Sequence, residues 1–415
     1  MPVPELELLT NYVSRVFRIE DVTTGSGVGQ HPTQALIARY RGQLINDDSV
    51  AAYDQLDELL RPYNITALFR KDGDKQVILL VPSLVLPGRP PRVWINVVLF
   101  FITVLAVMLT GVDVPRAVSL SGVTAELSYR IQHILGGWPF AASMLGILFT
   151  HEMGHYVMCR RYKVPATLPY FLPAPLISPF GTLGAFIMMR GIPRNKRVLF
   201  DVGVAGPLAG LVVAIPVLFI GLSLSKLGRI EVPPPGMGGW LEGNSLFYLF
   251  AKFVVFGRLL PEPASMGGLS PLAYWVRYFL SAHPIPFGGM DVMLSPVALA
   301  GWGGLLVTAL NLVPVGTLDG GHVAFGLFGD KARRIFPVAI GALILLSILP
   351  VFLAGSLSAF NFGWLLWIFI LFWLGNVRTQ PLDDITELDQ GRRILGYFVL
   401  LAFLLLFTPI PLVSY

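Results

Sequence analysis

The sequence predicts an all-α polytopic membrane protein that carries a small α+β module at its N-terminus. The first observation is composition: the chain of 415 residues is 54% hydrophobic and only 13% charged, whereas soluble domains carry about 25% charged residues. The second is patterning, because beyond residue 90 the apolar residues gather in runs of about 17 or more, the length that a helix needs to cross a bilayer.

The first 90 residues have the composition of a soluble module, which we expect to be cytoplasmic. The predicted elements are a short amphipathic helix at 6–17, a strand at 35–44, a helix at 49–60 and a hairpin of strands at 65–69 and 76–81. Asp48 can cap the second helix, and the Lys-Asp-Gly-Asp turn at 71–74 predicts the hairpin. Linkers are expected at 23–30 and 82–91. No apolar h-region is visible near the N-terminus, so we expect no signal peptide.

Residues 91–415 are expected to form the membrane domain, with about seven transmembrane helices. The predicted spans are mostly apolar and lie at 94–112, 138–159, 199–225, 296–314, 335–354, 360–376 and 394–412. Two further apolar segments, 164–190 and 244–290, are interrupted by proline and glycine, so we expect them to be re-entrant or to lie at the surface. The first of these has the pattern of a β-hairpin with an unpaired strand edge.

The basic residues predict the orientation of the chain. The net charge is +5, and lysine and arginine are concentrated in the loops at 160–197, 331–334 and 378–393. The positive-inside rule then places the N-terminus in the cytoplasm and the C-terminus on the opposite side of a cell membrane. Because these loops explain the basic balance, no nucleic-acid partner is expected.

A metal-binding motif lies inside the second predicted span. The run from His151 to His155 has the spacing H-E-x-x-H, and residues four apart share one face of a helix, so both imidazoles can reach one ion. Glu152 lies beside them, where a carboxylate can handle a proton. Ionisable groups at membrane depth cost about 2.5–3.5 kcal/mol each, so the motif needs a partner such as a metal ion. A catalytic zinc takes three protein ligands, so one ligand is still missing.

The best candidate for the third ligand follows the fourth predicted span. Pro314 and Gly316 interrupt the helix there, and Asp319 comes next, followed by the flexible Gly320. An acidic residue at a broken helix inside a membrane protein indicates function rather than a carboxylate that merely faces water. His322 is an alternative ligand, although we expect it to support the site instead.

The two motifs together resemble the signatures of the site-2 protease family of intramembrane zinc metalloproteases. That family has H-E-x-x-H on one span and N-x-x-P-x-x-x-x-D-G on a later one, which this chain matches at 151–155 and 311–320. Segments 180–185 and 201–210 extend the similarity, which covers residues 138–325 well. Order and spacing are most like the plastid and bacterial branch with an additional N-terminal domain, the ethylene-dependent gravitropism-deficient and yellow-green type.

The resemblance implies a zinc-dependent endopeptidase that cleaves transmembrane helices in regulated intramembrane proteolysis. Zn²⁺ would be held by His151, His155 and Asp319. Glu152 would be the catalytic residue, taking a proton from water and passing it to the leaving amine. The expected partners are therefore the lipid bilayer and a transmembrane protein substrate. The sequence indicates no oligomeric state.

Two positions are expected to bind substrate. The resemblance implies that Asn311 hydrogen-bonds the substrate backbone or the developing oxyanion, with a helix-packing amide as the alternative. The strand edge at 181–189, including Gly184, is expected to pair with an unwound substrate by β-addition. The alternative for this segment is that it only packs against the site.

Two other functions fit parts of the sequence. A catalytically inactive scaffold or chaperone on the same fold would use the N-terminal module, although this chain keeps all the zinc residues. A transporter would use the His/Glu/Asp cluster for protons or metal, but no internal repeat is visible. The small-residue pattern Gly206-x-x-x-Gly210 is expected to serve close helix packing.

Overall fold

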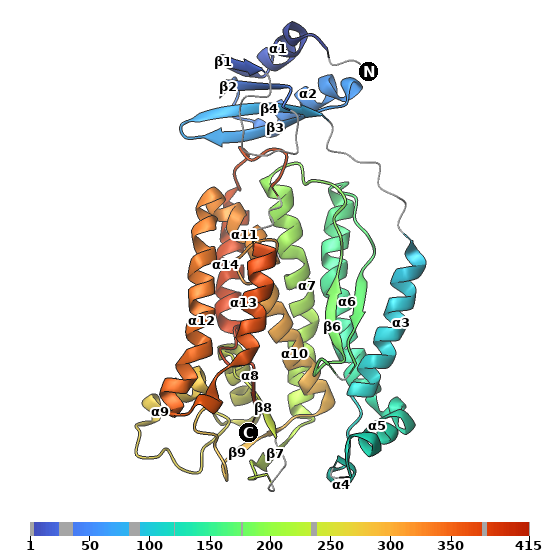
Figure 1. The fold of residues 1–415 in the computed structure, drawn as a ribbon, viewed down its shortest axis with the longest axis vertical. Coiled ribbons are helices and arrows are strands. Elements are labelled where there is room, and N and C mark those ends of the chain that lie inside the picture. Colours follow the sequence, from blue (N-terminus) through green and yellow to red (C-terminus); the bar gives the residue numbers. More distant parts are fainter. Residues whose placement is uncertain are drawn as a thin grey trace.

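An antiparallel sheet with two helices stands at one end of a helix bundle, and the C-terminus lies at the other end (Figure 1). The computed structural model describes residues 4–24, 36–82, 92–119, 121–175, 177–233, 239–375 and 380–414. The linkers expected at 23–30 and 82–91 fall almost wholly outside the described residues.

The N-terminal module contains a four-stranded sheet in the order β1-β2-β4-β3, with every neighbouring pair antiparallel. Its elements are α1 (Leu6–Ser14), β1 (Phe17–Thr24), β2 (Ala38–Leu44), α2 (Ser49–Leu60), β3 (Ile65–Asp72) and β4 (Lys75–Pro82). Asp48 caps α2 as expected, because its carboxylate accepts the backbone N–H groups of Val50 and Ala51. Strand β1 was not expected. It is a largely exposed edge strand, so it lacks the alternation of buried residues that reveals a strand.

The segment 381–389 returns from the membrane part and covers the edge of the module at β3. The backbone N–H of Phe69 donates to Leu382 O at 2.9 Å, and that of Asp384 donates to Phe69 O at 3.0 Å. Ile385 is only 7% exposed and belongs to the hydrophobic core of the module. The module is therefore completed by residues from far along the chain.

The same segment also binds the residues at the start of helix α7 (Lys196–Ser223). Its backbone N–H groups at Leu382 and Asp383 donate to Pro193 O and Arg194 O, at 2.9 and 2.7 Å. Lys196 forms a buried ion pair with Asp384 at 2.9 Å. Residues 381–389 thus join the module on one side and the helix start on the other.

Replacing Arg70 with methionine is expected to loosen this joint. The Arg70 guanidinium donates to the carbonyls of Phe69, Pro381 and Leu382 at 2.8–3.0 Å, and losing these bonds should cost about 2 kcal/mol. Hydrogen exchange of the amides in 381–389 should accelerate. Arg39→Met is the control, because its ion pair with Asp72 is on the module surface and is worth about 0.2–1 kcal/mol. Equal exchange in both variants would contradict the expectation.

The bundle consists mainly of helices whose bounds are close to the predicted spans, except that the last helix runs from Gln390 to Leu406 instead of the predicted 394–412. They are α3 (Val93–Thr110), α6 (Trp138–Arg161), α7 (Lys196–Ser223), α10 (Pro296–Asn311), α12 (Ile335–Ala354), α13 (Phe362–Gly375) and α14 (Gln390–Leu406). Among the described residues, four helical stretches are long and apolar enough to cross a membrane: Val93–Thr110, Ile134–Arg161, Lys196–Ser223 and Asp319–Ala354. The chain is therefore a mostly helical membrane protein.

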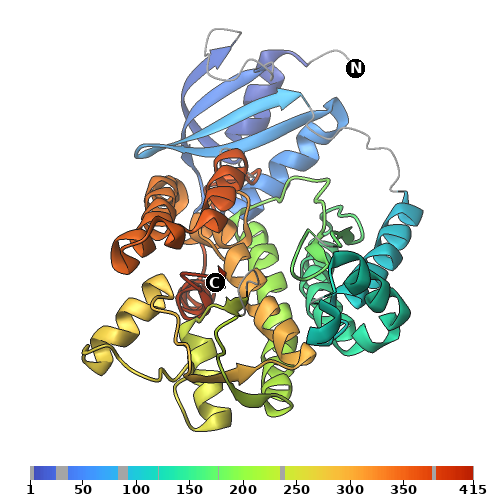
Figure 2. The same ribbon diagram turned by 60° about the horizontal axis from the view of Figure 1, so that its bottom comes forward.

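Helices α6, α7 and α10 pack together at the centre of the bundle (Figure 1). Glycines allow this approach: a Cβ on Gly221 of α7 would lie 2.2 Å from the backbone N of Ala298 in α10. A hairpin of β5 (Tyr170–Pro173) and β6 (Thr182–Phe186) lies beside them and contacts α3. Figure 2 shows α3 on one side of the bundle, in cyan, and α12 and α13 on the other, in orange.

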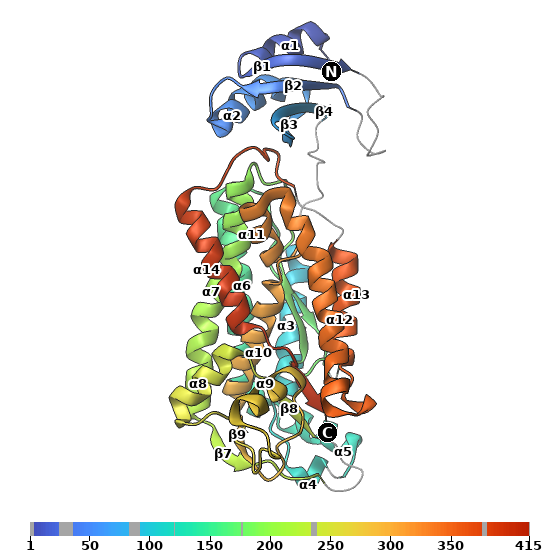
Figure 3. The same cartoon turned by 90° about the vertical axis from the view of Figure 1, so that its left-hand side faces the viewer.

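The apolar segment at 244–290 forms helices at the end of the bundle away from the module (Figure 3). The elements at that end include α8 (Leu246–Phe256), α9 (Pro271–Ser281) and two small sheets that pair β7 (Lys226–Arg229) with β9 (Met290–Met293), and β8 (Trp240–Glu242) with β10 (Leu412–Ser414). Helices α4 (Arg116–Ser119) and α5 (Val123–Gln132) lie at the same end, beneath α3.

Candidate metal centre and active site

Three predicted ligands meet where α6 passes the start of α11 (Asp319–Phe328). The Nε2 atoms of His151 and His155 lie 3.3 Å from Oδ2 and Oδ1 of Asp319, respectively. The two Nε2 atoms are 3.2 Å apart. The ligand atoms all lie within 4.8 Å of one another. Two imidazole nitrogens and a carboxylate oxygen are a donor set that suits zinc, so the residues present fit the ion.

The ring of His155 is held by a backbone carbonyl of α7. Its Nδ1 lies 2.8 Å from Val202 O, and since a carbonyl only accepts, Nδ1 carries the proton. The lone pair of Nε2 then points at the site, as a metal ligand requires. Sequence reasoning could not find Val202, because the chain uses its backbone and any residue type supplies a carbonyl.

Glycines bring α7 close enough to α6 to enclose both imidazoles. A Cβ on Gly154 of α6 would lie 2.5 Å from Ala205 O, which explains the close approach of the helices. A Cβ on Gly206 would lie only 2.0 Å from Nε2 of His155, and one on Gly210 would lie 3.2 Å from Cβ of His151. The pattern expected to serve helix packing therefore also leaves room for the metal-binding atoms.

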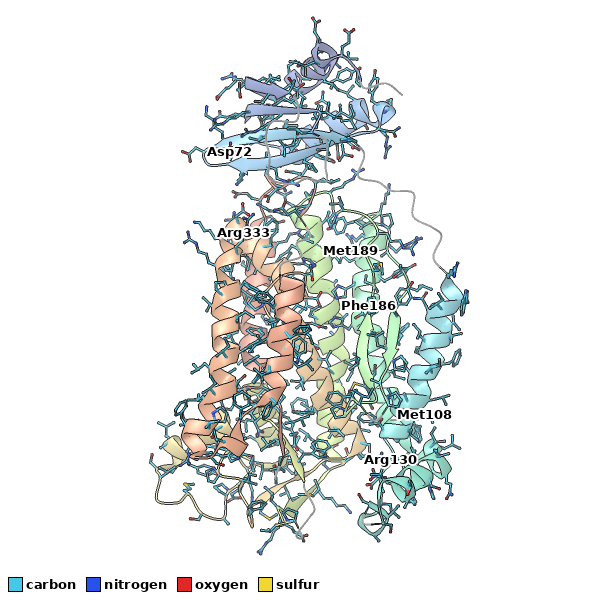
Figure 4. The ribbon with its side chains drawn as sticks, in the orientation of Figure 1. Asp72, Met108, Arg130, Phe186, Met189 and Arg333 are labelled. Atoms are coloured by element: carbon cyan, nitrogen blue, oxygen red, sulfur yellow. The ribbon has the colours of Figure 1, made fainter. Side chains whose placement is uncertain are left out.

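Glu152 faces the same cavity as the three ligands. The cavity has a volume of about 210 Å³, and one wall is the stretch from Ala185 to Ile187, which comprises the end of β6 and the residue after it. The Glu152 side chain is only 5% exposed, and its carboxylate accepts a hydrogen bond from the backbone of Ile187. Figure 4 labels Phe186, which belongs to this stretch, and Met189, a further lining residue, on the segment that runs beside α6. A buried carboxylate therefore lies beside the ligand set.

Asn311 and His322, which were also named from the sequence, line the cavity but are outside the set of three candidate ligands. Asn311 lines the cavity, with its Nδ2 3.4 Å from Nε2 of His151. His322 is buried and also lines the cavity, but it is outside the group of three ligand atoms. It lies against α7, where a Cβ on Gly203 would be 2.8 Å from the Cβ of His322.

The predicted substrate segment is a hairpin in which β6 pairs with β5. Within the part of the chain that the structure describes, β6 has no second strand partner. Gly184 has φ +98°, a backbone conformation that favours glycine. It does not line the cavity, which begins at the next residue, Ala185. The role of Gly184 in substrate binding therefore stays a prediction.

Comparisons with known proteins agree with this geometry. A family model described as peptidase family M50 matches residues 139–354. The probable zinc metalloprotease EGY2, chloroplastic, of Oryza sativa subsp. indica is 28% identical over 84% of this chain and 56% of its own length. The probable zinc metalloprotease EGY1, chloroplastic, of Arabidopsis thaliana is 28% identical over 66% of this chain and 43% of its own. The chain spans about half the length of the curated relatives it matches.

Proposed function

The chain belongs to peptidase family M50, and from this we propose that it is a zinc-dependent intramembrane endopeptidase that cleaves transmembrane helices in regulated intramembrane proteolysis. The resemblance to site-2 proteases is confirmed. The observation that carries the proposal is the meeting of two imidazole nitrogens and one carboxylate within 4.8 Å, in a cavity that Glu152 also lines. An inactive scaffold on the same fold is not favoured, because no member of this set is missing.

His151, His155 and Asp319 would hold Zn²⁺, which would act as a Lewis acid on the attacking water and on the scissile carbonyl. Glu152, held by the Ile187 backbone, takes the proton of the attacking water and gives it to the leaving amine. Its burial keeps bulk water away from this transfer. The Asn311 amide, at the same cavity, donates to the oxygen that gains charge.

The edge of β6 would bind the substrate as an added strand. A transmembrane helix must unwind before its peptide bond can reach the centre, and its freed N–H and C=O groups then need partners. Ala185 to Ile187 line the cavity, and β6 has no second strand partner among the described residues, so main-chain pairing along this edge can supply them. Gly184, whose backbone N–H and C=O contact the Thr182 hydroxyl, would join this pairing after releasing that contact. Pairing through the main chain suits substrates of differing sequence.

We further propose seven spans, with residues 1–90 as a cytoplasmic module and 91–415 as the membrane protease domain. The module and the C-terminus lie at opposite ends of the bundle, which supports an odd number of crossings. The sequence leads us to expect a cell membrane, whereas the relatives are described as chloroplastic. A reporter fused after Tyr415 tests the orientation: reporter activity on the cytoplasmic side would contradict it. Cell fractionation with the same fusion identifies the membrane.

Zinc content tests the proposal directly. Wild-type protein purified in detergent should hold about one zinc per chain and cleave a generic transmembrane substrate. Asp319→Asn should weaken zinc retention at least about 100-fold, because a charged ligand becomes a poor neutral one. Asp330→Asn is the control, since that exposed carboxylate pairs with Arg333. Absence of zinc from fresh wild type would overturn the proposal, and full retention by Asp319→Asn would assign the third ligand to His322.

A further inference from the structure

We propose that the protein has a second binding site, for a phosphate-bearing anion, in the cavity between the N-terminal module and the end of α6. This goes beyond the proposed peptidase function. The cavity has a volume of about 500 Å³, within the range of small-molecule sites. Its walls come from α2, from the end of α6 and the turn after it, from the residues around the start of α7, and from Asp383 in the joining segment.

The walls of this cavity carry an excess of positive charge. Four cationic side chains and two carboxylates line it, which leaves a surplus of two positive charges. Three of the lining cations, Arg61, Arg161 and Lys163, are exposed and form no ion pair with any residue that the structure describes. They come from the module and from the end of α6, so an anion between them would be bound by both parts.

The two carboxylates of the cavity already have partners. Asp54 is paired with Arg194 at 2.9 Å. The Asp383 carboxylate accepts the backbone N–H groups of Ile385 and Thr386 at 2.8 and 3.2 Å, and also the Thr386 hydroxyl. Since these contacts use both carboxylates, neither is free to pair with the three unpaired cations.

A buried hydroxyl among these groups has no partner. Tyr53 lines the cavity and is only 3% exposed, and its hydroxyl has no hydrogen-bond partner among the described groups. Burial, with the neighbouring carboxylates Asp57, Asp383 and Asp54, holds the pKa of this phenol well above its usual range, so the group stays a neutral donor. An unsatisfied buried donor is unfavourable. The hydroxyl oxygen itself is buried, so a small shift of the ring would bring it to the cavity surface, where an anionic oxygen would accept from it.

A phosphate group fits this set of donors. Arginine binds phosphate oxygens through paired N–H groups, lysine adds a point charge, and a phenol donates one further bond. The two negative charges of a phosphomonoester match the surplus on the walls. The phosphate could be carried by a soluble molecule or by a lipid headgroup. Arg161 follows His155 by six residues, about 9 Å along the helix, so the ligand would join the module to the helix that carries the metal ligands.

Binding to the purified full-length protein tests the site. Inorganic pyrophosphate, titrated by calorimetry in a neutral detergent, is the soluble probe. Short-chain phosphatidic acid, compared with phosphatidylcholine and counted by native mass spectrometry, is the lipid probe. Arg161→Gln and Lys163→Gln should each weaken binding about tenfold, and Tyr53→Phe should weaken it several-fold because it removes only the hydroxyl. Arg160→Gln is the matched control, since Arg160 is also exposed at the helix end but does not line the cavity.

Each outcome decides the proposal. Saturable pyrophosphate binding that the three variants weaken, and the control does not, supports the site with a soluble ligand. The same pattern with phosphatidic acid alone supports a headgroup. No saturable binding of either probe, or equal weakening by Arg160→Gln, overturns the site. Neither readout needs cleavage or zinc, so failure of the anion-site proposal is distinguishable from failure of the peptidase proposal. Tyr53→Phe removes only a hydroxyl and should fold normally, so weaker binding in this variant would not reflect unfolding.

Discussion

Glu152→Gln is expected to lower cleavage of a transmembrane substrate by about 10³-fold, the middle of the usual range for a lost general base, while zinc per chain stays at the wild-type level. Glutamine has the size of glutamate but accepts no proton, and Glu152 is not among the three ligands that converge on Asp319. The measurement is cleavage rate and zinc content on the same preparation.

The control for this variant is Glu126→Gln. Glu126 belongs to α5 and pairs with Arg130 at the far end of the bundle, so its loss should leave the cleavage rate unchanged. Cleavage that survives Glu152→Gln would remove Glu152 from the mechanism. Loss of zinc together with activity would show instead that the carboxylate holds the ion.

Gly206→Ala is expected to release zinc and abolish cleavage, with zinc affinity falling at least about 100-fold. The new methyl carbon would start 2.0 Å from Nε2 of His155, the atom that must bind the metal. Either the ring turns away or α7 moves back from α6, and both outcomes separate the ligands. Zinc content and thermal unfolding should be measured together, because the loss should exceed any change in stability.

Two other glycines on the same pair of helices make matched controls. Gly146→Ala in α6 meets open space, so it should keep zinc and stabilise the helix by up to about 1 kcal/mol. Gly210→Ala would place its Cβ 3.2 Å from Cβ of His151, and an intermediate zinc affinity is expected. If all three variants keep zinc, the close approach of α7 is not what shapes the site.

Local patterns were enough to predict the long helices of the bundle and the three side chains that meet at the candidate metal centre. A run of apolar residues fixes a membrane helix by length alone, and the bounds of α12 match the predicted 335–354. The spacing of His151 and His155 places both on one helix face. The helix break at Pro314 indicates that Asp319, just after it, is a functional residue. Each of these signals lies within a few residues, so no knowledge of distant contacts was needed.

Features that depend on distant contacts could not be predicted. Val202 contributes a carbonyl, and Ile187 contributes its backbone to Glu152, so side-chain identity carries no signal for either. Strand β1 owes its conformation to pairing with β2 rather than to its own pattern. The contact of Gly206 with His155 was hidden because a small-residue pattern predicts packing but not which side chain lies opposite.

The joint formed by residues 381–389 makes the module a discontinuous domain. A fragment that ends at residue 90 would keep β3 but lose the backbone partners of Phe69, leaving an open strand edge. It would also expose the apolar slot that Ile385 fills. Open edges beside apolar surface favour self-association, so such a fragment should aggregate or dimerise. An oligomeric state measured on the fragment would then result from the truncation and would not report that of the full-length protein.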